Sequence, residues 1–563
     1  MLFAFFAGAM AAQVYSGGDN GIAIESRYAW PLKVERGYVP VEIRVDNSSK
    51  ATREIRIELI ESYGYSANTS RTVVLEPGER RTLEFLLPGY LDHSAQHSLT
   101  VFEGNDWITS LSSIGPYERS TDGRGSVLLV SASEPDYDST YAWVDRLVLS
   151  DINAIGAVGF EDLPKNQGAY SSLGLVILDV RDGTPAREEL EPITSWVRLG
   201  GSLVVVGDEG PGFAAADDLL SPWMEERFAW TPWLESGLLP GLNSRSMGLG
   251  QLAFLSEEEL DQPLIVRSVV QPAWSSPLSR RLPRGPTGND PGALPVIPGV
   301  GHLPRGAFAL LIFGIAILLG PVNAFVVRLL KRPASLLATT PIIALSSTAV
   351  MVGYGIAHNG LGVRTASHSM TMLDQRTHTA ATHNVRQLYI GFSPRGGLRP
   401  AAETLHFPVS PDWDFNPQIT WEQGRVLGGD LAPVRTGTRQ VVLSEGSARQ
   451  RLDLVGDEAA NALGADILTA IVRTDEGWFL IEDLEEGDSA VLEPIEDLEP
   501  ELAMLWESEM ATKTPSPWPD RAMDWPVGTY VARIETSPFL DTEGVEVKEE
   551  AGEHWVVGVM EDS

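Results

Sequence analysis

Two long apolar segments dominate the hydrophobic pattern of this chain. Residues 306–327 and 334–357 contain no Asp, Glu, Lys or Arg, and each is long enough to cross a bilayer as a helix, which takes about 20 residues. The short segment between them carries Arg328, Lys331 and Arg332. The pattern therefore predicts two transmembrane helices joined in a hairpin with a basic turn. A helical hairpin buried in a soluble protein is the alternative, although soluble cores seldom contain two uncharged runs of this length.

The basic turn also predicts an orientation for the hairpin. Because cytoplasmic loops are enriched in Lys and Arg, the turn is expected in the cytoplasm, and the long segments on either side of the hairpin are expected outside it. Arg305 and Arg364 lie on the outer flanks and weaken this asymmetry. Residues 1–12 are apolar and end in small residues, as in a cleaved secretory signal, although a positive n-region is missing. Together these features predict a protein of the bacterial inner membrane with large extracytoplasmic domains.

Asn323 is a polar residue at membrane depth, two residues after Pro321. Polar side chains of membrane helices hydrogen-bond to neighbouring helices, and proline is tolerated where a neighbouring helix covers the carbonyl group that it leaves free. Asn323 and Pro321 are therefore expected at the contact between the two helices. A transport role for Asn323 is the alternative, but no ionisable residue within either segment marks a proton relay or an ion path.

Residues 20–120 consist of short runs with partial polar–apolar alternation, separated by turn residues. This pattern predicts a β-sandwich. Residues 39–47, followed by the Pro-Gly-Glu turn within 75–88, resemble bacterial immunoglobulin-like domains that lie next to membrane anchors. The resemblance implies that this turn joins two late strands of such a domain.

Residues 125–270 instead alternate apolar strands with an amphipathic helical pattern at 187–201. Strands that alternate with helices predict a parallel sheet, and continuous Val and Leu runs are typical of strands covered on both faces. Asp179, Asp182, Asp208 and Glu209 follow these strands. They are expected at the carboxyl edge of the sheet, where open α/β sheets bind ligands, so a divalent cation or a small ligand is one prediction. Solvated loop acids, with Asp182 as a helix cap ahead of Pro185, are the alternative.

This segment resembles the class I glutamine-amidotransferase-like superfamily, a flavodoxin-like α/β fold, through Leu175–Val180, Ile193–Gly201 and Ser202–Gly207. Active members place a cysteine nucleophile on a sharp turn after a strand, whereas this chain has no cysteine. Residues 206–210 offer no Ser elbow, and no histidine lies between residues 97 and 302. The segment is therefore interpreted as a degenerate domain that serves in binding or assembly.

The remaining segments complete the predicted domain order. Residues 271–304 are rich in Pro, Gly and Ser and are expected to form a linker. Residues 360–563 predict a mostly-β domain, with a hairpin at the Asp-Glu-Gly turn of residues 475–477. Near its start lie three histidines, for which a zinc or copper site on a β surface is weighed against exposed imidazoles: His368, His378 and His383.

The net charge of −34 excludes nucleic acid as an expected partner, because such binding needs a basic footprint. The lack of cysteine excludes disulfides, thiolate nucleophiles and cysteine-ligated metals. No cofactor is predicted apart from the divalent cation considered above.

Over most of its length the chain resembles a loosely described group of bacterial membrane proteins that combine a sandwich, an amidotransferase-like domain, a transmembrane segment with an LLGPVN-type motif and a β-rich tail. The motif here is Leu318–Asn323, and Asn461–Pro494 matches the tail. Some relatives are thought to accompany ABC-type transporter components. The resemblance implies no established activity.

The predicted function is a non-enzymatic envelope protein, anchored in the lipid bilayer, that binds or scaffolds other envelope proteins or transporter subunits. One alternative is a metal-assisted hydrolase that uses Asp179, Asp208 and Glu209. Another is a transporter in its own right, which two spans without ionisable groups disfavour.

Overall fold

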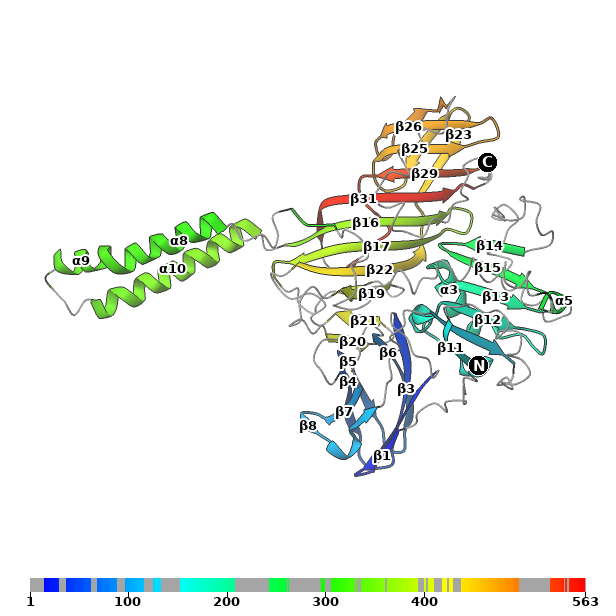
Figure 1. Ribbon diagram of the computed structural model, residues 1–563, viewed down its shortest axis with the longest axis horizontal. Coiled ribbons are helices and arrows are strands. Elements are labelled where there is room, and N and C mark those ends of the chain that lie inside the picture. Colours follow the sequence, from blue (N-terminus) through cyan, green and yellow to red (C-terminus); the bar gives the residue numbers. More distant parts are fainter. Residues whose placement is uncertain are drawn as a thin grey trace, which may run out of the picture.

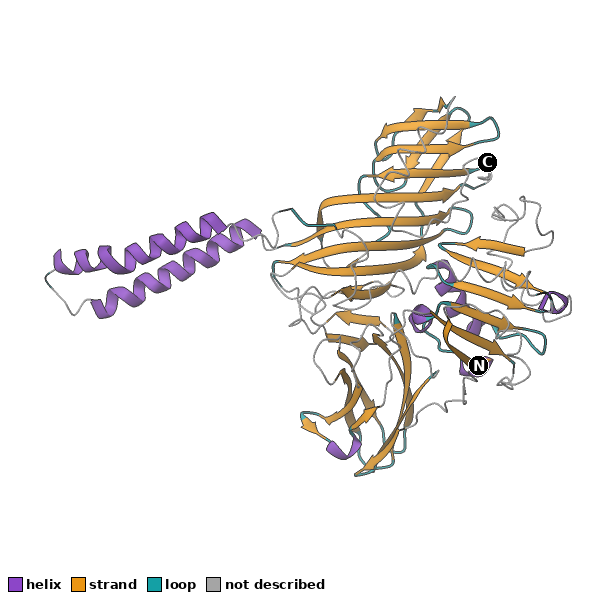
Figure 2. Cartoon of the chain, in the orientation of Figure 1, coloured by secondary structure: helices purple, strands orange, loops and turns teal. Residues whose placement is uncertain are grey.

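The computed structural model describes residues 15–29, 37–61, 68–88, 97–115, 125–132, 152–207, 243–260, 262, 295–298, 305–329, 331, 336–359, 362–392, 399–400, 404–409, 418–422, 425–428, 437–495, 527–540, 542–543 and 546–561. These residues form a large β-rich body from which a helical hairpin extends (Figures 1 and 2). The multidomain, β-rich architecture expected from the sequence is therefore confirmed. The predicted signal segment 1–12, the acids Asp208 and Glu209, and most of the linker 271–304 lie outside the described residues.

The N-terminal part contributes antiparallel strands to two sheets. The first has the order β1 (Tyr15–Asp19), β2 (Ile22–Tyr28), β3 (Tyr38–Asn47) and β6 (Arg80–Pro88). The second contains β5 (Asn68–Leu75), β4 (Arg53–Glu61), β7 (His97–Glu103), β8 (Asp106–Trp107) and β9 (Ser113–Gly115). Alternate residues such as Ile43 and Ile57 are fully buried and belong to one hydrophobic cluster. The period-2 pattern thus turns one face of each sheet toward a shared core.

A strand pair from far along the sequence completes the second of these sheets. Strand β20 (Gln418–Glu422) lies parallel to β5, pairing Gln418 with Asn68 and Thr420 with Ser70. Its hairpin partner β21 (Arg425–Gly428) forms the edge. The region after the helical hairpin therefore contributes strands to the N-terminal sheet, which the domain order expected from the sequence does not anticipate.

The middle part is built on a six-stranded sheet with the order β11 (Ile152–Gly159), β10 (Gly125–Ser131), β12 (Leu175–Asp179), β13 (Ser202–Val206), β15 (Gly250–Leu255) and β14 (Asn243–Met247). The pairs from β11 through β15 are parallel, and β14 is antiparallel. All residues of β12 and β13 are buried, as expected for central strands of a parallel sheet. Helix α3 (Arg187–Arg198) connects β12 to β13 and buries Ile193, Trp196 and Val197.

The C-terminal part is mostly β, as predicted. Its nine-stranded sheet has the order β19 (Thr404–Val409), β22 (Gly437–Ser447), β17 (Thr379–Ile390), β16 (Val363–Asp374), β31 (Val547–Val559), β29 (Thr529–Ile534), β25 (Ile467–Arg473), β26 (Trp478–Leu484) and β28 (Glu493–Pro494). Strands β25 and β26 form the hairpin expected at the Asp-Glu-Gly turn. A small sheet packs beside this end and shares a hydrophobic cluster with it: β23 (Arg451–Val455), β24 (Glu458–Ala462) and β27 (Ser489–Val491). A separate short pair joins β18 (Arg399–Pro400) to β30 (Thr542–Glu543).

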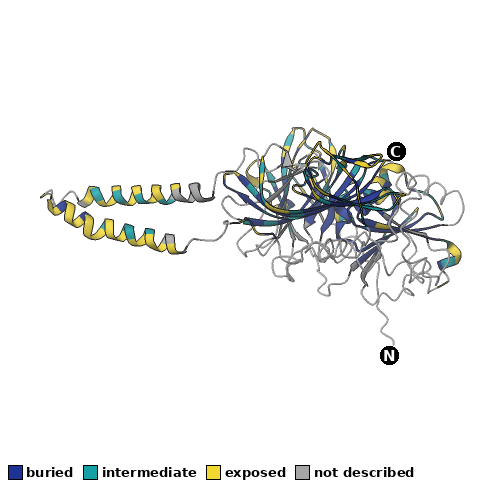
Figure 3. Cartoon of the chain, turned by 90° about the horizontal axis from the view of Figure 1, so that it is seen from above, coloured by how far each residue is buried: buried dark blue, intermediate teal, exposed yellow. Residues whose placement is uncertain are grey.

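The hairpin consists of α8 (Arg305–Ile317), a π-helical turn at Leu318–Val322, α9 (Asn323–Leu329) and α10 (Leu336–Asn359). It projects away from the body, and its surface is largely exposed (Figures 1 and 3). Within the described residues, the helical stretch Ala309–Leu329 is long and apolar enough to cross a membrane, whereas the apolar stretch Leu337–Met351 of α10 is shorter. Large apolar side chains face outward along both helices, among them Phe313 at 67% and Leu337 at 84% exposure.

Both ends of the hairpin meet the nine-stranded sheet. Strand β16 begins at Val363, shortly after α10 ends. On the other side, Ile297 is fully buried against Ala366 and Tyr389, and its backbone N–H donates to Gln387 Oε1 at 2.8 Å. The chain is therefore fixed to the sheet a few residues before α8, as well as directly after α10.

Candidate functional site

The carboxyl edge of the parallel sheet carries an ion pair. Asp179 ends β12 and is 6% exposed. The Arg181 guanidinium donates from Nε to Asp179 Oδ1 at 3.0 Å and from Nη2 to Oδ2 at 2.7 Å, and the Arg181 backbone N–H donates to Oδ1 at 3.1 Å. The hydrogen bonds to Asp179 raise the pKa of Arg181. Both oxygens of this carboxylate are therefore engaged by one cation.

Among the described residues, the predicted acid Asp182 does not join Asp179 in a cluster. Arg181 Nη1 donates instead to Glu257 at 3.3 Å, and Asp182 is exposed. The expectation that Asp182 caps a helix is wrong, because α3 begins at Arg187 and the Glu189 carboxylate accepts from the Ala186 N–H at 2.7 Å. In the described part of the chain, no group of three or more His, Asp or Glu side chains is arranged to hold a metal ion. Asp208 and Glu209, which complete the predicted set, lie outside it.

The three histidines considered as metal ligands occupy different environments. His378 lies in the β16–β17 turn with a φ of +53° and an exposed side chain, 3.8 Å from Glu561. His368 and His383 are on the same face of β16 and β17, where His383 is buried opposite Met370. His368 Nδ1 lies 4.0 Å from Glu553 Oε2. The structure therefore does not bring the three imidazoles together.

Asn323 and Pro321 lie in the half of the hairpin nearer its turn. Pro321 falls within the π-helical turn, which accommodates a residue without a backbone N–H. Asn323 follows that turn, is 2% exposed and donates from Nδ2 to Thr340 Oγ1 of α10 at 3.1 Å. The amide therefore links the two helices at the point where α8 and α9 meet.

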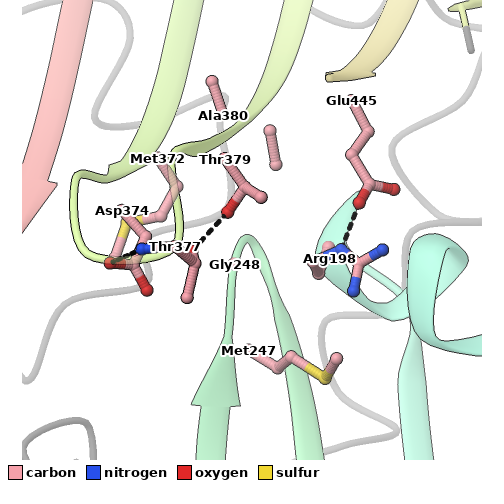
Figure 4. Close-up of a pocket in the computed structure, with 10 residues that line it drawn as sticks. Arg198, Met247, Gly248, Met372, Asp374, Thr377, Thr379, Ala380 and Glu445 are labelled. Atoms are coloured by element: carbon pink, nitrogen blue, oxygen red, sulfur yellow. Dashed lines mark hydrogen bonds and ion pairs between the residues drawn. The ribbon is translucent and has the colours of Figure 1, made fainter. Parts of the chain in front are cut away.

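A small cavity lies where the middle part meets the nine-stranded sheet (Figure 4). Arg198, at the end of α3, and Glu445 of β22 form an ion pair, each with a side chain about nine-tenths buried, and Ser195 also donates to Glu445. The β14–β15 turn at Gly248 and the β16–β17 turn at Asp374 and Thr377 line the other side. The volume of about 40 Å³ has room for a few water molecules only, so the cavity is too small for a substrate. We call this polar contact between α3 and β22 the seam.

Tyr38 joins three parts of the body. Its backbone N–H donates to Ser171 Oγ at 2.9 Å, and its phenol donates to the backbone carbonyl of His406 on β19. Its ring lies 4.8 Å from that of Phe407, and burial raises the pKa of the phenol. The preceding Gly37 has a φ of +76°, and a Cβ there would overlap the Ser171 backbone. Residues of all three parts accordingly belong to one continuous hydrophobic cluster.

One face of the nine-stranded sheet is polar yet buried. Alternate residues of five neighbouring strands share this face, and they include Ser367 and Ser369 of β16, Asn384 and Arg386 of β17, Gln440 of β22, His406 of β19 and His554 of β31. Burial lowers the pKa of Arg386 to about 10 and that of His406 to about 3, the latter helped by the nearby Arg386 cation. The imidazole of His406 is therefore neutral at physiological pH.

This polar face is not among the features predicted from the sequence. Its signal is present in β16, where Thr365, Ser367, Ser369 and Thr371 recur at every second position. Such alternation normally marks a solvent-facing side of a strand. Only the burial of these side chains distinguishes a buried polar layer from an ordinary wet face.

Comparisons with known proteins do not assign a family. No family model matches the sequence, and no curated protein matches it. Similar solved structures include a Paenibacillus cycloisomaltooligosaccharide glucanotransferase, at 9% identity and a TM-score of 0.15 over 35% of this chain and 27% of that one. The yeast delta-COP-I mu-homology domain, bound to a Dsl1 peptide, gives 7% identity and a TM-score of 0.15 over 36% of this chain and 96% of that domain.

A putative β-galactosidase from Bacteroides fragilis covers 84% of this chain and 72% of its own, at 9% identity and a TM-score of 0.16. The present chain spans about a quarter of the glucanotransferase. At these TM-scores the similarities carry no argument about the overall fold or the activity.

Proposed function

We propose that this protein is a bacterial inner-membrane protein whose helical hairpin anchors an extracytoplasmic body that binds or scaffolds other envelope components. The observation that carries the proposal is the hairpin itself. It extends from the body and exposes large apolar side chains along both helices, including Leu310, Phe313, Leu337 and Leu345. Exposed apolar surface of this extent marks an interaction or membrane site, and the lipid bilayer is the partner that fits an uncharged helical pair.

The charge of the turn supports the orientation with the body outside the cytoplasm. Arg328 and Lys331 lie at the far end of the hairpin, where the positive-inside tendency favours the cytoplasmic side. Since both outer ends of the hairpin lead into the same body, the N-terminal and C-terminal parts would lie together on the opposite side. The predicted secretory signal requires the same placement.

The proposal includes an assignment of the middle part and of the N-terminal part to domain types. The order of the parallel strands, numbered along the chain, is 2-1-3-4-5, which is the order of flavodoxin-like folds and supports a degenerate amidotransferase-like domain. The two N-terminal sheets with a shared core support an immunoglobulin-like sandwich. A binding or assembly role suits the middle part, because Arg181 engages the Asp179 carboxylate that a metal-assisted hydrolase would need.

An accessory role beside an ABC-type transporter is the specific form of scaffold that we favour. Tyr38 and the common hydrophobic cluster join the body into one unit. A displacement of one part by a bound partner would therefore also displace the other parts and the hairpin. Such mechanical continuity suits a protein that couples an extracytoplasmic partner to a membrane complex.

Three measurements test the proposal. Carbonate extraction of cells that express a tagged copy should leave the protein in the membrane pellet, and release into the supernatant would overturn the anchor. Affinity purification in mild detergent, followed by mass spectrometry, should recover ATPase and permease subunits in stoichiometric amounts. Recovery of the protein alone would remove the transporter role, and metal-dependent turnover lost in Asp208→Asn would favour the hydrolase.

A further inference from the structure

The buried polar face of the nine-stranded sheet contains a linked serine, histidine and glutamate. Ser369 Oγ lies 2.7 Å from His554 Nδ1, and His554 Nε2 lies 3.0 Å from Glu549 Oε1. An ionised carboxylate can only accept hydrogen bonds, so Glu549 selects the Nε2–H tautomer of the imidazole. Nδ1 is then the acceptor, and the Ser369 hydroxyl is the donor. A nucleophile bonded to a base that a third group orients is the signature of nucleophilic catalysis.

The backbone is shaped for this arrangement. Residues 549 and 554 are an odd number of positions apart, so a regular strand would place them on opposite faces. A register shift in β31, where Glu549 faces Thr365 but Ala551 faces Ala366, inserts one extra residue and returns both side chains to the same face. Gly552 lies between them, and a Cβ at this position would overlap both the imidazole and the carboxylate. A bulge and a glycine together therefore make room for the contact.

A cation lies on the same face of the sheet, beside Ser367. Arg386 of β17 pairs in register with Ser367, the neighbour of Ser369 on this face, and is 5% exposed. Its Nε donates to Gln440 at 3.2 Å, and Glu549 is close enough to interact with its charge. A guanidinium in a water-poor site stabilises negative charge that develops on a nearby oxygen.

We propose that Ser369, His554 and Glu549 form a nucleophilic acyl-transfer centre that takes small carboxylic esters, with Arg386 as the oxyanion-stabilising cation. Ser369 Oγ attacks the acyl carbon while its proton passes to His554 Nδ1. The intermediate collapses by breaking the bond to the alkoxide leaving group, which takes that proton from His554. Water then attacks the acyl-serine with His554 again as base, and carboxylic acid and free serine are released. Ester and water are consumed, and acid and alcohol are formed.

Ser369 is 1% and His554 0% exposed, so an acyl donor reaches the serine only where the surrounding side chains give way, and a small donor needs the least displacement. Small acyl donors are therefore the expected class. This inference concerns a part of the molecule that the anchoring and scaffold role does not use, so either proposal can fail without the other.

The test is labelling of the full-length protein in detergent with a small fluorophosphonate. Attack by Ser369 would form an oxygen–phosphorus bond and expel fluoride, and peptide mass spectrometry of the wild-type protein should find the adduct on Ser369. Ser369→Ala should abolish the adduct, and His554→Gln should slow labelling by about 100-fold or more, the usual contribution of a general base. Gly552→Ala should slow it as well, because the new methyl group separates the imidazole from the carboxylate.

Ser444→Ala is the matched control. Ser444 lies on the same face of the sheet, but its Oγ is 3.3 Å from the Thr404 hydroxyl rather than near an imidazole, so labelling should be unchanged. Absence of any adduct on wild-type Ser369 would overturn the proposal, as would a labelling rate that His554→Gln leaves unchanged. The adduct on Ser369 is mapped on the wild-type protein, so this result does not depend on whether the variants fold.

Discussion

At the scale of single residues, the polar groups that the fold buries carry the largest expected effects. Glu445 and Arg198 come from different parts of the chain and are both about nine-tenths buried. A buried ion pair contributes little relative to an apolar pair, but removal of one partner leaves a charge without compensation. The pair between Arg27 and Asp162, at 3.3 Å, is exposed. Removal of one of these partners costs little free energy, because water solvates the charge that remains.

Glu445→Gln should therefore lower the free energy of unfolding by about 3–5 kcal/mol. Asp162→Asn, which breaks the exposed pair, should change it by less than about 1 kcal/mol. Denaturant titration of the detergent-solubilised protein measures both values. Equal effects of the two substitutions would show that the seam between α3 and β22 does not hold the charge of Arg198 away from water.

His406 gives the protein a specific sensitivity to acid. Burial lowers its pKa from 6.5 to about 3, so between these values the unfolded chain binds a proton that the folded chain excludes. The free energy of unfolding should then fall as the pH falls through this window, by at most about 1.4 kcal/mol per pH unit from this group. Thermal unfolding at pH 7 and pH 5 should show a smaller loss in His406→Gln than in wild type. Parallel losses would contradict the buried neutral imidazole.

At the scale of elements, the strand pair β20–β21 is the clearest example of structure set by distant sequence. It extends the N-terminal sheet through its parallel pairing with β5. Its own sequence, residues 418–428, is short and would form at best a marginal hairpin in water without the sheet beside it. The stability of β5 and that of β20 are therefore expected to depend on each other.

Replacement of residues 418–428 by a flexible Gly-Ser segment of equal length should expose the edge of β5. Amide hydrogen exchange should then speed up at residues 68–70 and remain slow in the β17–β22 ladder. Replacement of Ser489–Val491 by glycines is the control, because β27 pairs with β24 in the small C-terminal sheet rather than with the N-terminal sheet. Unchanged protection at residues 68–70 would refute the dependence.

At the scale of the whole molecule, the three parts of the body share one core. Tyr38 touches the middle part through Ser171 and the C-terminal part through His406 and Phe407. A shared core makes the parts lose their packing together rather than one at a time. The body is therefore expected to behave as one cooperative unit, despite its several sheets.

Calorimetry of the wild-type protein should accordingly show one main transition for the body. Tyr38→Ala should lower its free energy of unfolding by about 3–5 kcal/mol, as for other fully buried aromatic residues, without dividing the transition into separate steps. Trp107→Ala, at a position that is 59% exposed, should change it by about 0.5 kcal/mol or less. Well-separated transitions in the wild-type protein would contradict a common core.

The sequence by itself determined the features that depend on local pattern. Runs without charge predicted the helices around Phe313 and Leu345, alternation predicted the β-rich parts, and continuous apolar runs predicted the buried strands at Leu175–Asp179 and Ser202–Val206. These succeed because helix and strand periods depend on neighbouring residues alone. The hydrogen bond from Asn323 to the other helix was likewise predicted from local sequence, because a polar residue within an apolar helical run requires a hydrogen-bond partner.

The tertiary structure decided everything that depends on which distant segments meet. It paired Arg198 with Glu445, 247 residues apart, and placed β20 beside β5. It also placed Glu549 and His554 on one face, since the single inserted residue that re-phases β31 cannot be read from its period-2 pattern. Long-range pairing and local register shifts follow from the free energy of the whole packed molecule, and no window of the sequence contains that information.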